Sequence, residues 1–201
     1  MASLFFHYAT MNAGKSTQLL QVNFNYQERG MKCLLLTAAI DDRYGTRKIA
    51  SRIGIEAEAE VFAKNDNLLE RFLIRAKVDG VAAVLVDEAQ FLTSKQVAQL
   101  ASAVDRLGLP VMAYGLRSDF RGRLFEGSSA LFELADKLVE LKTICHCGKR
   151  ATMVMRKDES GHPTFDGDQV QIGGNDTYTA LCRRHWMEAH DAATMSRSSQ
   201  N

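Results

Sequence analysis

The sequence predicts an α/β fold, in which a mainly parallel β-sheet carries helices on both faces and a small β-rich, metal-bound lobe follows it. Short apolar runs alternate with amphipathic segments through the first 140 or so residues, as in parallel α/β sheets. A strand-like run at residues 4–8 passes directly into a glycine turn and a helix start. After residue 143 the composition changes, and three of the four cysteines gather there beside a histidine.

Apolar runs with polar or glycine boundaries predict the strands. Residues 81–86 (VAAVLV) are the clearest case, because so short an apolar run is typical of a strand buried on both faces. In chain order we expect strands at residues 4–8, 32–37, 60–62, 81–86, 110–114 and 137–140.

Apolar residues spaced three and four apart predict the helices. In residues 67–77 this spacing places five side chains on one face: Leu68, Leu69, Phe72, Leu73 and Ala76. In chain order we expect helices at residues 15–28, 67–77, 94–107 and 131–135. Residues 38–54 are polar and rich in Arg and Asp, which favours a functional loop over a packed element.

Composition describes an ordinary globular chain of 201 residues, 46% hydrophobic and 24% charged. A net charge of +1 with no basic stripe gives no support to nucleic-acid or membrane-surface binding. No apolar run reaches the roughly 18 residues that a membrane span needs. The N-terminus lacks the basic region of a signal peptide, so we expect a cytoplasmic protein.

The residues after the first strand, ATMNAGKS at 9–16, are typical of a phosphate-binding turn. Backbone N–H groups and a helix N-terminus would face phosphate oxygens, Lys15 would reach the outer phosphates, and the Ser16 hydroxyl would bind Mg²⁺. The Walker A pattern has Gly where this chain has Ala9. Taken alone, the fragment is equally consistent with Gly14 merely starting a helix.

A second motif follows the strand at 81–86, where Asp87 and Glu88 stand side by side. Ligands of parallel sheets collect at the carboxyl ends of the strands, so Asp87 is placed to hold Mg²⁺ directly or through water. Side chains alternate along a strand, which leaves Glu88 to act on a nucleophile, either water or a substrate hydroxyl. Together the two motifs predict a P-loop domain of RecA-like architecture, a nucleotidase or a kinase.

The third motif is a set of four metal-ligand residues: Cys145, Cys147, Cys182 and His185. Three thiolates and an imidazole complete a tetrahedral zinc site and leave no open position, so the zinc is expected to be structural. His146 lies between two of these ligands and could compete for the metal. Cys33 lies in an apolar run and is expected to be a core residue.

The order and spacing of six motifs, over residues 4–185, resemble the thymidine kinases of the type II, cytosolic kind, especially the bacterial members. The motifs are MNAGKST, IDDRYG, LVDEAQFL, YGLRSDFRG, the CHC…CRRH set and IGGNDTY. The resemblance implies transfer of the γ-phosphate of ATP to the 5′-hydroxyl of thymidine, giving dTMP for nucleotide salvage and DNA synthesis. It implies Glu88 as the general base.

The resemblance also implies the binding residues. For ATP they are Ala9, Thr10, Met11, Asn12, Ala13, Gly14, Lys15, Ser16, Asp87, Glu88, Ala89 and Gln90. For thymidine they are Met11, Phe91, Leu116, Phe120, Gln171, Ile172, Gly173, Gly174 and Tyr178, of which residues 171–174 and Tyr178 belong to a lasso loop whose main chain would hold the base. Arg43 is either close to a phosphate or a solvated loop residue. A homotetramer and feedback inhibition by dTTP are implied by resemblance only.

We therefore expect a P-loop nucleotide-binding domain at 1–143, a zinc-binding lobe with the lasso at 144–191, and a disordered tail at 192–201. The main alternative is a RecA-like P-loop ATPase in which Glu88 activates water and the zinc lobe is an interaction module. A zinc-ribbon nucleic-acid protein is a further alternative, against which the net charge of +1 counts.

Overall fold

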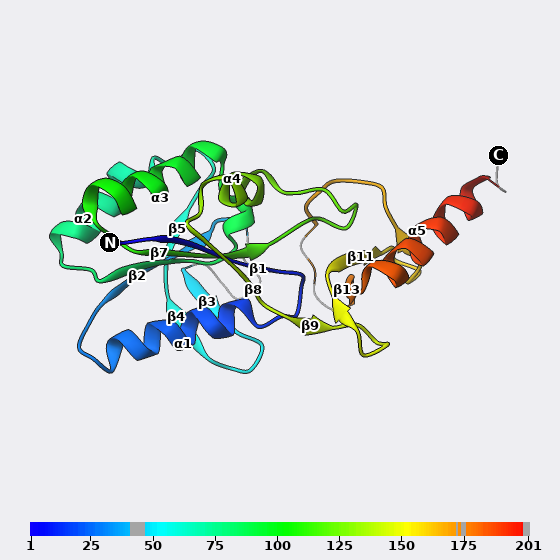
Figure 1. Cartoon of the computed structure of the whole chain (residues 1–201). Helices are drawn as coiled ribbons and strands as arrows, with labels where there is room; N and C mark the ends of the chain where they lie inside the picture. Colours follow the sequence, from blue (N-terminus) through cyan, green and yellow to red (C-terminus); the bar gives the residue numbers. More distant parts are fainter. Residues whose placement is uncertain (41–46, 172, 174–175, 199–201) are drawn as a thin grey trace. The chain divides into compact units, whose positions relative to one another are not determined.

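The computed structural model describes residues 1–40, 47–171, 173 and 176–198, with side chains described as far as residue 195, and the chain forms two compact units (Figure 1). The first unit consists of Met1–Tyr8, Gly14–Leu116 and Phe125–Leu141. The second unit consists of Ala9–Ala13, Arg117–Leu124 and Lys142–Asn201. The second unit therefore joins the last 60 residues of the chain to two short segments from earlier in it.

A six-stranded sheet forms the centre of the first unit, in the order β5-β2-β6-β7-β1-β8. Its strands are β1 (Leu4–Ala9), β2 (Cys33–Ala38), β5 (Glu60–Phe62), β6 (Ala83–Val86), β7 (Val111–Leu116) and β8 (Lys137–Glu140). The pairings β5–β2, β2–β6, β6–β7 and β1–β8 are all parallel. The predicted mainly parallel sheet is thus confirmed, and each of the six expected strands is present.

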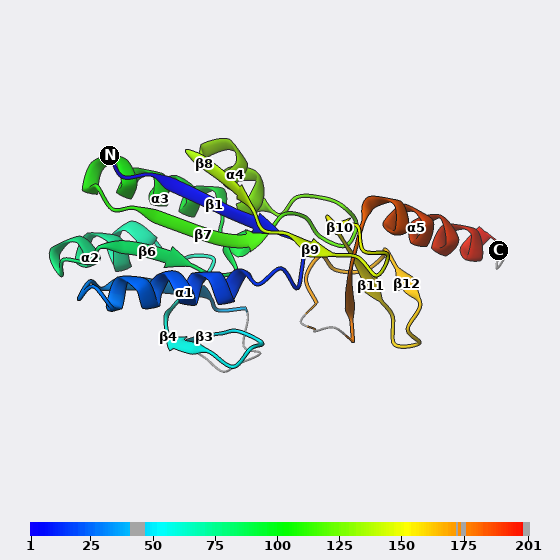
Figure 2. The same ribbon diagram turned by 60° about the horizontal axis from the view of Figure 1, so that its bottom comes forward.

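Helices cover both faces of this sheet (Figure 2). Helix α1 (Lys15–Gln27) lies on one face, and α2 (Ile74–Val78), α3 (Ser94–Leu107) and α4 (Glu126–Leu134) lie on the other. Strand alternation divides the core accordingly, because Leu35 and Leu85 pack with α1, whereas Leu36 and Val86 pack with α3.

Helix α3 shows how local sequence fixes an element. Thr93 and Gln96 form a capping box, with the Thr93 hydroxyl accepting from the Gln96 N–H at 3.2 Å and the Gln96 side chain accepting from the Thr93 N–H at 3.0 Å. Gly108 ends the helix with φ of 64°, a conformation that glycine adopts at least cost.

Three expectations for the first unit differ from the structure. The helix expected at 67–77 begins as a π-helical turn, η1 (Leu69–Leu73), before α2. Helix α4 begins five residues before the expected start at 131. Strand β3 (Lys48–Ala50) lies inside the expected loop and pairs antiparallel with β4 (Glu56–Glu58), which follows that loop, because Ile49 buries its side chain against α1. Residues 41–46, which include Arg43, lie outside the described residues.

The second unit has a small β-structure followed by a helix. Strands β9 (Thr143–Ile144) and β10 (Arg150–Ala151) form one hairpin, and β12 (Pro163–Thr164), β11 (Met153–Lys157) and β13 (Tyr178–Leu181) form an antiparallel sheet. Helix α5 (Arg183–Ser198) follows. Its buried core is small: Cys145, Ala151, Met153, Leu181, Cys182 and Trp186. Such a core is consistent with a lobe stabilised by metal ligation.

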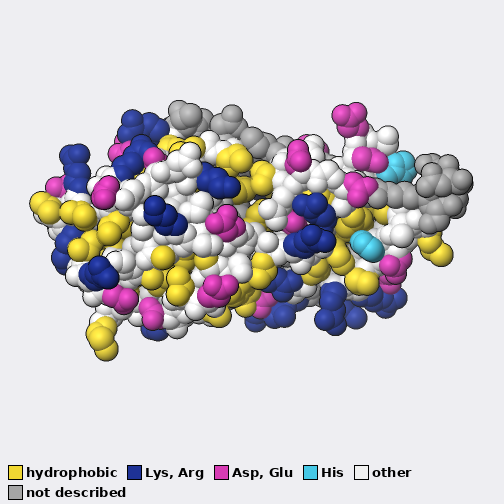
Figure 3. Space-filling view, turned by 90° about the horizontal axis from the view of Figure 1, so that it is seen from above, with side chains coloured by type: hydrophobic (Ala, Val, Ile, Leu, Met, Phe, Trp, Pro, Cys, Tyr) yellow, Lys and Arg dark blue, Asp and Glu magenta, His cyan; other side chains and the backbone are white. Residues whose placement is uncertain are grey.

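The tail expected to be disordered from residue 192 differs from the structure, because α5 continues to Ser198. Ala192, Ala193 and Met195 are strong helix formers, which the polar composition of the tail conceals. Within the described part of the chain, no helix is long and apolar enough to cross a membrane. On the face shown in Figure 3, basic and acidic side chains are interspersed over most of the surface, in keeping with the net charge of +1.

Candidate functional site

The turn between β1 and α1, which the sequence predicts to bind phosphate, contains two residues with a left-handed backbone. Ala9 is the last residue of β1, extended and 3% exposed, so a side chain is tolerated at this position. Positive φ values occur instead at Asn12 (64°) and Gly14 (73°). The Gly14 carbonyl then accepts the first helical bond from the Gln18 N–H at 2.9 Å. The departure from the Walker A pattern at Ala9 therefore does not disturb the turn.

Ser16 and Asp87 meet at the carboxyl end of the sheet. The Ser16 hydroxyl donates to Oδ2 of Asp87 at 2.8 Å, joining the start of α1 to the end of β6. Burial, and next the charge of Glu88, raise the pKa of Asp87 to about 7, against the opposing effect of the Ser16 hydrogen bond. Among the described residues, Oδ1 of Asp87 has no hydrogen-bond partner.

These two side chains fit a magnesium ion. A hydroxyl and a carboxylate oxygen are hard oxygen ligands of the kind that Mg²⁺ takes in nucleotide sites. A cation beside Asp87 would also offset the charge of a carboxylate that is only 5% exposed.

Glu88 is held in an unusual backbone conformation immediately after β6. Its φ of 51° and ψ of 38° are left-handed, and the short helix η2 (Ala89–Phe91) begins at the next residue. A non-glycine residue in this region costs free energy and persists where surrounding contacts fix it.

The side chain of Gln90 provides such a contact. Its Nε2 donates to Oε2 of Glu88, and its Oε1 accepts from the Leu116 N–H at 2.9 Å. Because a backbone N–H only donates, the Leu116 contact fixes which way the amide points and aims the NH₂ group at the Glu88 carboxylate. Gln90 is 2% exposed, so this orientation is held by the protein.

Helix α4 packs against the segments that contain Gln90 and Leu116. The Ser128 hydroxyl donates to the Leu116 carbonyl at 2.6 Å. Gly127 lies so close to η2 that a Cβ built on it would be 2.5 Å from the Ala89 carbonyl oxygen and 2.9 Å from that of Gln90. The missing side chain of Gly127 is therefore what lets α4 pack against the segment that carries Glu88.

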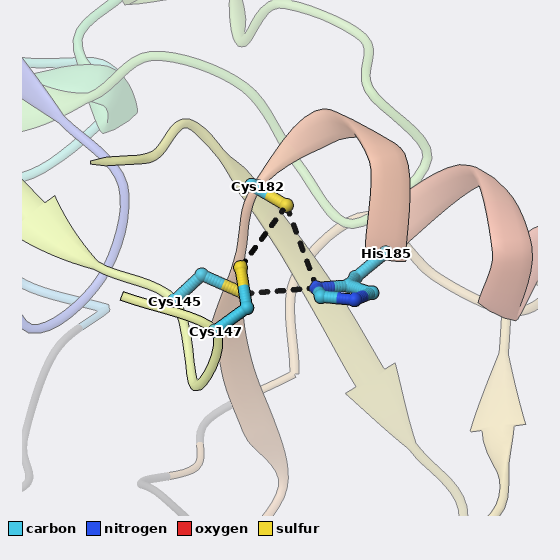
Figure 4. Close-up of side chains that lie close together, drawn as sticks. All are labelled: Cys145, Cys147, Cys182 and His185. Atoms are coloured by element: carbon cyan, nitrogen blue, oxygen red, sulfur yellow. Dashed lines mark hydrogen bonds between the residues drawn. The ribbon is translucent and has the colours of Figure 1, made fainter. Parts of the chain in front are cut away.

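The four predicted metal ligands come together in the second unit (Figure 4). Their ligand atoms all lie within 4.8 Å of one another, with Nδ1 of His185 3.3 Å from Sγ of Cys145 and 3.5 Å from Sγ of Cys182. The sulfurs of Cys147 and Cys182 are 3.9 Å apart. Tetrahedral zinc requires about 3.8 Å between sulfurs and about 3.5 Å between sulfur and nitrogen, so the geometry and the donor set both fit Zn²⁺.

The Cys145 thiol loses its proton more readily than an ordinary cysteine, as a metal ligand must. Burial alone would raise the pKa of the Cys145 thiol, but N–H groups of Cys147 and Cys182 and the His185 side chain lower it to about 6. Nε2 of His185 faces a carboxylate oxygen of Glu188 at 3.8 Å, which leaves Nδ1 for the metal. His146 stacks on the His185 ring at 4.3 Å, so it lies beside the predicted ligand set.

Predicted thymidine-binding residues of the second unit form an aromatic cluster. Phe120, Val154 and Tyr178 are buried together, and Met11 packs against them. The Tyr178 hydroxyl donates to the Gln171 carbonyl at 2.7 Å, which ties the predicted lasso to this cluster.

The other predicted thymidine residues are placed as follows. Gly173 approaches Thr177 closely, since a Cβ there would be 2.6 Å from Oγ1 of Thr177. Phe91 belongs to the first unit and contacts Phe125 edge-on at 6.0 Å, and Leu116 lies at the end of β7. Ile172 and Gly174 lie outside the described residues.

The sequence analysis missed two residues of this cluster. Nε1 of Trp186 donates to the Phe120 carbonyl at 3.0 Å and to the Val154 carbonyl at 2.9 Å, so the residue after His185 holds the Phe120 loop. Arg156 places its guanidinium 3.8 Å from the centre of the Phe120 ring. The one available signal was that Trp186, the single tryptophan of the chain, follows a metal-ligand histidine.

The sequence model of the thymidine kinase family matches residues 2–186 of this chain. The chain belongs to the thymidine kinase family. Curated relatives named thymidine kinase include that of Photobacterium profundum (58% identical), that of Vibrio vulnificus (57%) and that of Ruegeria pomeroyi (59%). In each case the alignment covers 94% of this chain and 96–98% of the relative.

Membership of the thymidine kinase family confirms the resemblance drawn from the motifs. The match runs from β1 into the first turn of α5, so it includes the predicted phosphate-binding turn, Glu88 and all four predicted metal ligands. The family therefore accounts for both units of the chain together.

Proposed function

We propose that this chain transfers the γ-phosphoryl group of ATP to the 5′-hydroxyl of thymidine, producing dTMP and ADP. The observation that carries the proposal is the match to the thymidine kinase family over residues 2–186, with relatives of that name at 57–59% identity. The site residues below are assigned on this basis and on the contacts of each side chain.

The turn after β1 and the end of β6 bind the donor in this proposal. Residues 9–16 present backbone N–H groups to the phosphates of ATP, and Lys15 adds a positive charge. Ser16 and Asp87, already 2.8 Å apart, are the residues that would hold Mg²⁺. Mg²⁺ held by these two side chains would supply positive charge against the phosphate oxygens of ATP.

Glu88 is the proposed general base. It accepts the proton of the 5′-hydroxyl as that oxygen attacks the γ-phosphorus. The hydrogen bond from Gln90 and the left-handed backbone hold its carboxylate in one orientation, which lowers the entropy cost of reaching a reactive geometry. Ala89 and Gln90 are further residues of the ATP site in the proposed assignment.

The acceptor side uses the aromatic cluster and the lasso. Phe120 and Tyr178 offer apolar surface to the nucleoside, with Met11 as a further wall residue. Phe91 and Leu116 are the remaining side chains assigned to thymidine in this proposal. Main-chain groups of residues 171–174 hold the imide edge of thymine, since glycines at 173 and 174 let backbone approach a ligand closely.

Zinc is assigned a structural role. Four protein ligands leave no coordination position for water or substrate. Through Trp186, next to the ligand His185, the site holds the carbonyl of Phe120 in place.

The test is formation of dTMP from thymidine and ATP with Mg²⁺, compared with ATP consumption when no nucleoside is present. A kinase consumes ATP only with thymidine, whereas equal consumption without it would favour the P-loop ATPase alternative. Glu88→Gln should retain ATP and thymidine binding while kcat falls by roughly 10²–10⁴, the usual contribution of general acid–base catalysis. Glu159→Gln, at an exposed turn after β11, is the matched control and should leave kcat unchanged.

Inhibition by dTTP and assembly into a homotetramer are further parts of the proposal, and both rest on resemblance to the family. Initial rates with added dTTP and light scattering on the purified protein test them separately.

A further inference from the structure

Arg156 is a buried cation in β11 that contacts two parts of the second unit at once. Arg156 is only 5% exposed. The face of the guanidinium lies 3.8 Å from the ring centre of Phe120. The edge donates from Nη1 to the Asp168 carbonyl at 2.8 Å and from Nη2 to the Asp166 carbonyl.

A second contact joins the same two parts. Nε2 of Gln169 donates to Oδ2 of Asp119 at 3.0 Å, and Asp119 is 3% exposed. Its other oxygen accepts the backbone N–H groups of Arg121 and Arg123 at 2.9 and 2.8 Å. Asp119 therefore shapes the loop that carries Phe120 and also holds the residue that follows Asp168.

The chemistry of this arrangement requires arginine. A flat guanidinium stacks on an aromatic ring with its face while its edge donates several hydrogen bonds in fixed directions, which an ammonium group cannot do. Burying a cation costs its hydration free energy, so a buried arginine is found where hydrogen bonds and a cation–π contact compensate for that cost. The partners here are main-chain carbonyls of the segment that leads into the lasso, which Arg156 thus orders.

We propose that Arg156 is a positioning residue that holds residues 166–169 against the Phe120 loop, and thereby sets the affinity for the nucleoside acceptor. This arrangement of Arg156, Phe120 and residues 166–169 is called the arginine clasp below. The inference rests on the proposed function for its link to thymidine, whereas the clasp itself is a property of the fold that can be measured without any substrate.

Two glycines provide a matched pair of variants. Gly167 has φ of 93°, and a Cβ there would lie 2.7 Å from Nη2 of Arg156. Gly161 has φ of 83°, with nothing within 4 Å of a Cβ. Both alanine variants carry similar backbone strain, but only Gly167→Ala pushes on the clasp.

The first measurement is amide hydrogen exchange of residues 166–171 in the zinc-loaded full chain. In Gly167→Ala and Arg156→Lys, exchange there should rise by roughly tenfold or more, the scale for loss of hydrogen bonds to a charged group. In Gly161→Ala it should match the parent. Unchanged exchange in both Gly167→Ala and Arg156→Lys would overturn the clasp.

The second measurement is steady-state kinetics with zinc content determined on the same samples. The KM for thymidine should rise roughly 10- to 100-fold in Arg156→Lys, with the KM for ATP and the zinc content unchanged. Equal increases in both KM values, or loss of zinc, would show a purely structural role and overturn the proposal. If the parent protein does not phosphorylate thymidine, the proposed function fails, while hydrogen exchange still decides whether the clasp exists.

Discussion

Replacing Gly127 by alanine should destabilise the protein, although alanine is the better helix former. Gly127 is the second residue of α4 and faces η2, the short helix that follows Glu88. An alanine Cβ there would lie 2.5 Å from the carbonyl oxygen of Ala89, 2.7 Å from that of Leu92 and 2.9 Å from that of Gln90. All three contacts are with backbone, so no side-chain rotation relieves them.

Two opposing effects set the size of the change. The gain in helix propensity from glycine to alanine is at most about 1 kcal/mol. Inserting a methyl group into a closely packed site costs about 1–3 kcal/mol, and contact with three backbone oxygens argues for the upper end. The expected net loss is therefore about 2 kcal/mol, equivalent to a fall in Tm of about 4–8 °C for a chain of this size.

Thermal and urea unfolding of the substrate-free protein measure this loss, and kcat measured on the same variant reports the displacement of η2. Ser129→Ala is the matched control, because it also replaces a weak helix former in α4 and should change stability by less than about 0.5 kcal/mol. We also expect kcat of Gly127→Ala to fall, because the displaced backbone of η2 carries Gln90 and directly follows Glu88. A variant as stable as the parent would refute the reasoning that close approach, and not propensity, selects glycine here.

Two further predictions concern charge and metal. The pKa of Asp87 is raised to about 7, so ionisation of this carboxyl opposes folding, with a cost that grows from about pH 4 to about pH 7 and is constant above. Asp87→Asn removes that cost, so the variant should be more stable than the parent, as measured by urea unfolding in Mg²⁺-free buffer. This difference in unfolding free energy should be about 2 kcal/mol larger at about pH 8 than at about pH 5.5. Equal differences at both pH values would contradict a buried carboxylate with a raised pKa. Cys182→Ala should lose its zinc and raise the KM for thymidine, as measured by metal analysis and kinetics. Cys33→Ala is the control, because it changes a cysteine of β2 far from the ligand set in sequence, and it should keep the zinc content and the KM of the parent. A zinc-free but fully active Cys182→Ala would refute the role given to the metal.

The regular elements followed from sequence because their apolar residues repeat with the period of a strand or a helix. Residues 60–62 and 94–107 match β5 and α3 at both ends. The start of α4 did not follow, because Gly127, Ser128 and Ser129 are weak helix formers. Packing against η2 and the hydrogen bond from Ser128 to Leu116 override propensity there.

The candidate site divides in the same way. Glu88, Asp87 and the four metal ligands were visible because their chemistry depends on residue type and short spacing. Gln90 as a support for Glu88, and Arg156 as a support for Phe120, were not visible. Their partners include main-chain groups 12 or more residues away in the chain, such as the Leu116 N–H and the Asp168 carbonyl, and any residue type supplies a carbonyl group.

The first half of the phosphate-binding turn, Ala9–Ala13, belongs to the unit built mainly from the end of the chain. The Thr10 hydroxyl donates to the Met153 carbonyl at 3.0 Å, across a separation of 143 residues. During synthesis, this one contact of a motif near the start of the chain cannot form until Met153 has been made. A chain shortened before β11 would keep every residue of the sequence ATMNAGKS and lose this contact, so the sequence of the motif does not by itself include everything that the motif touches in the folded protein.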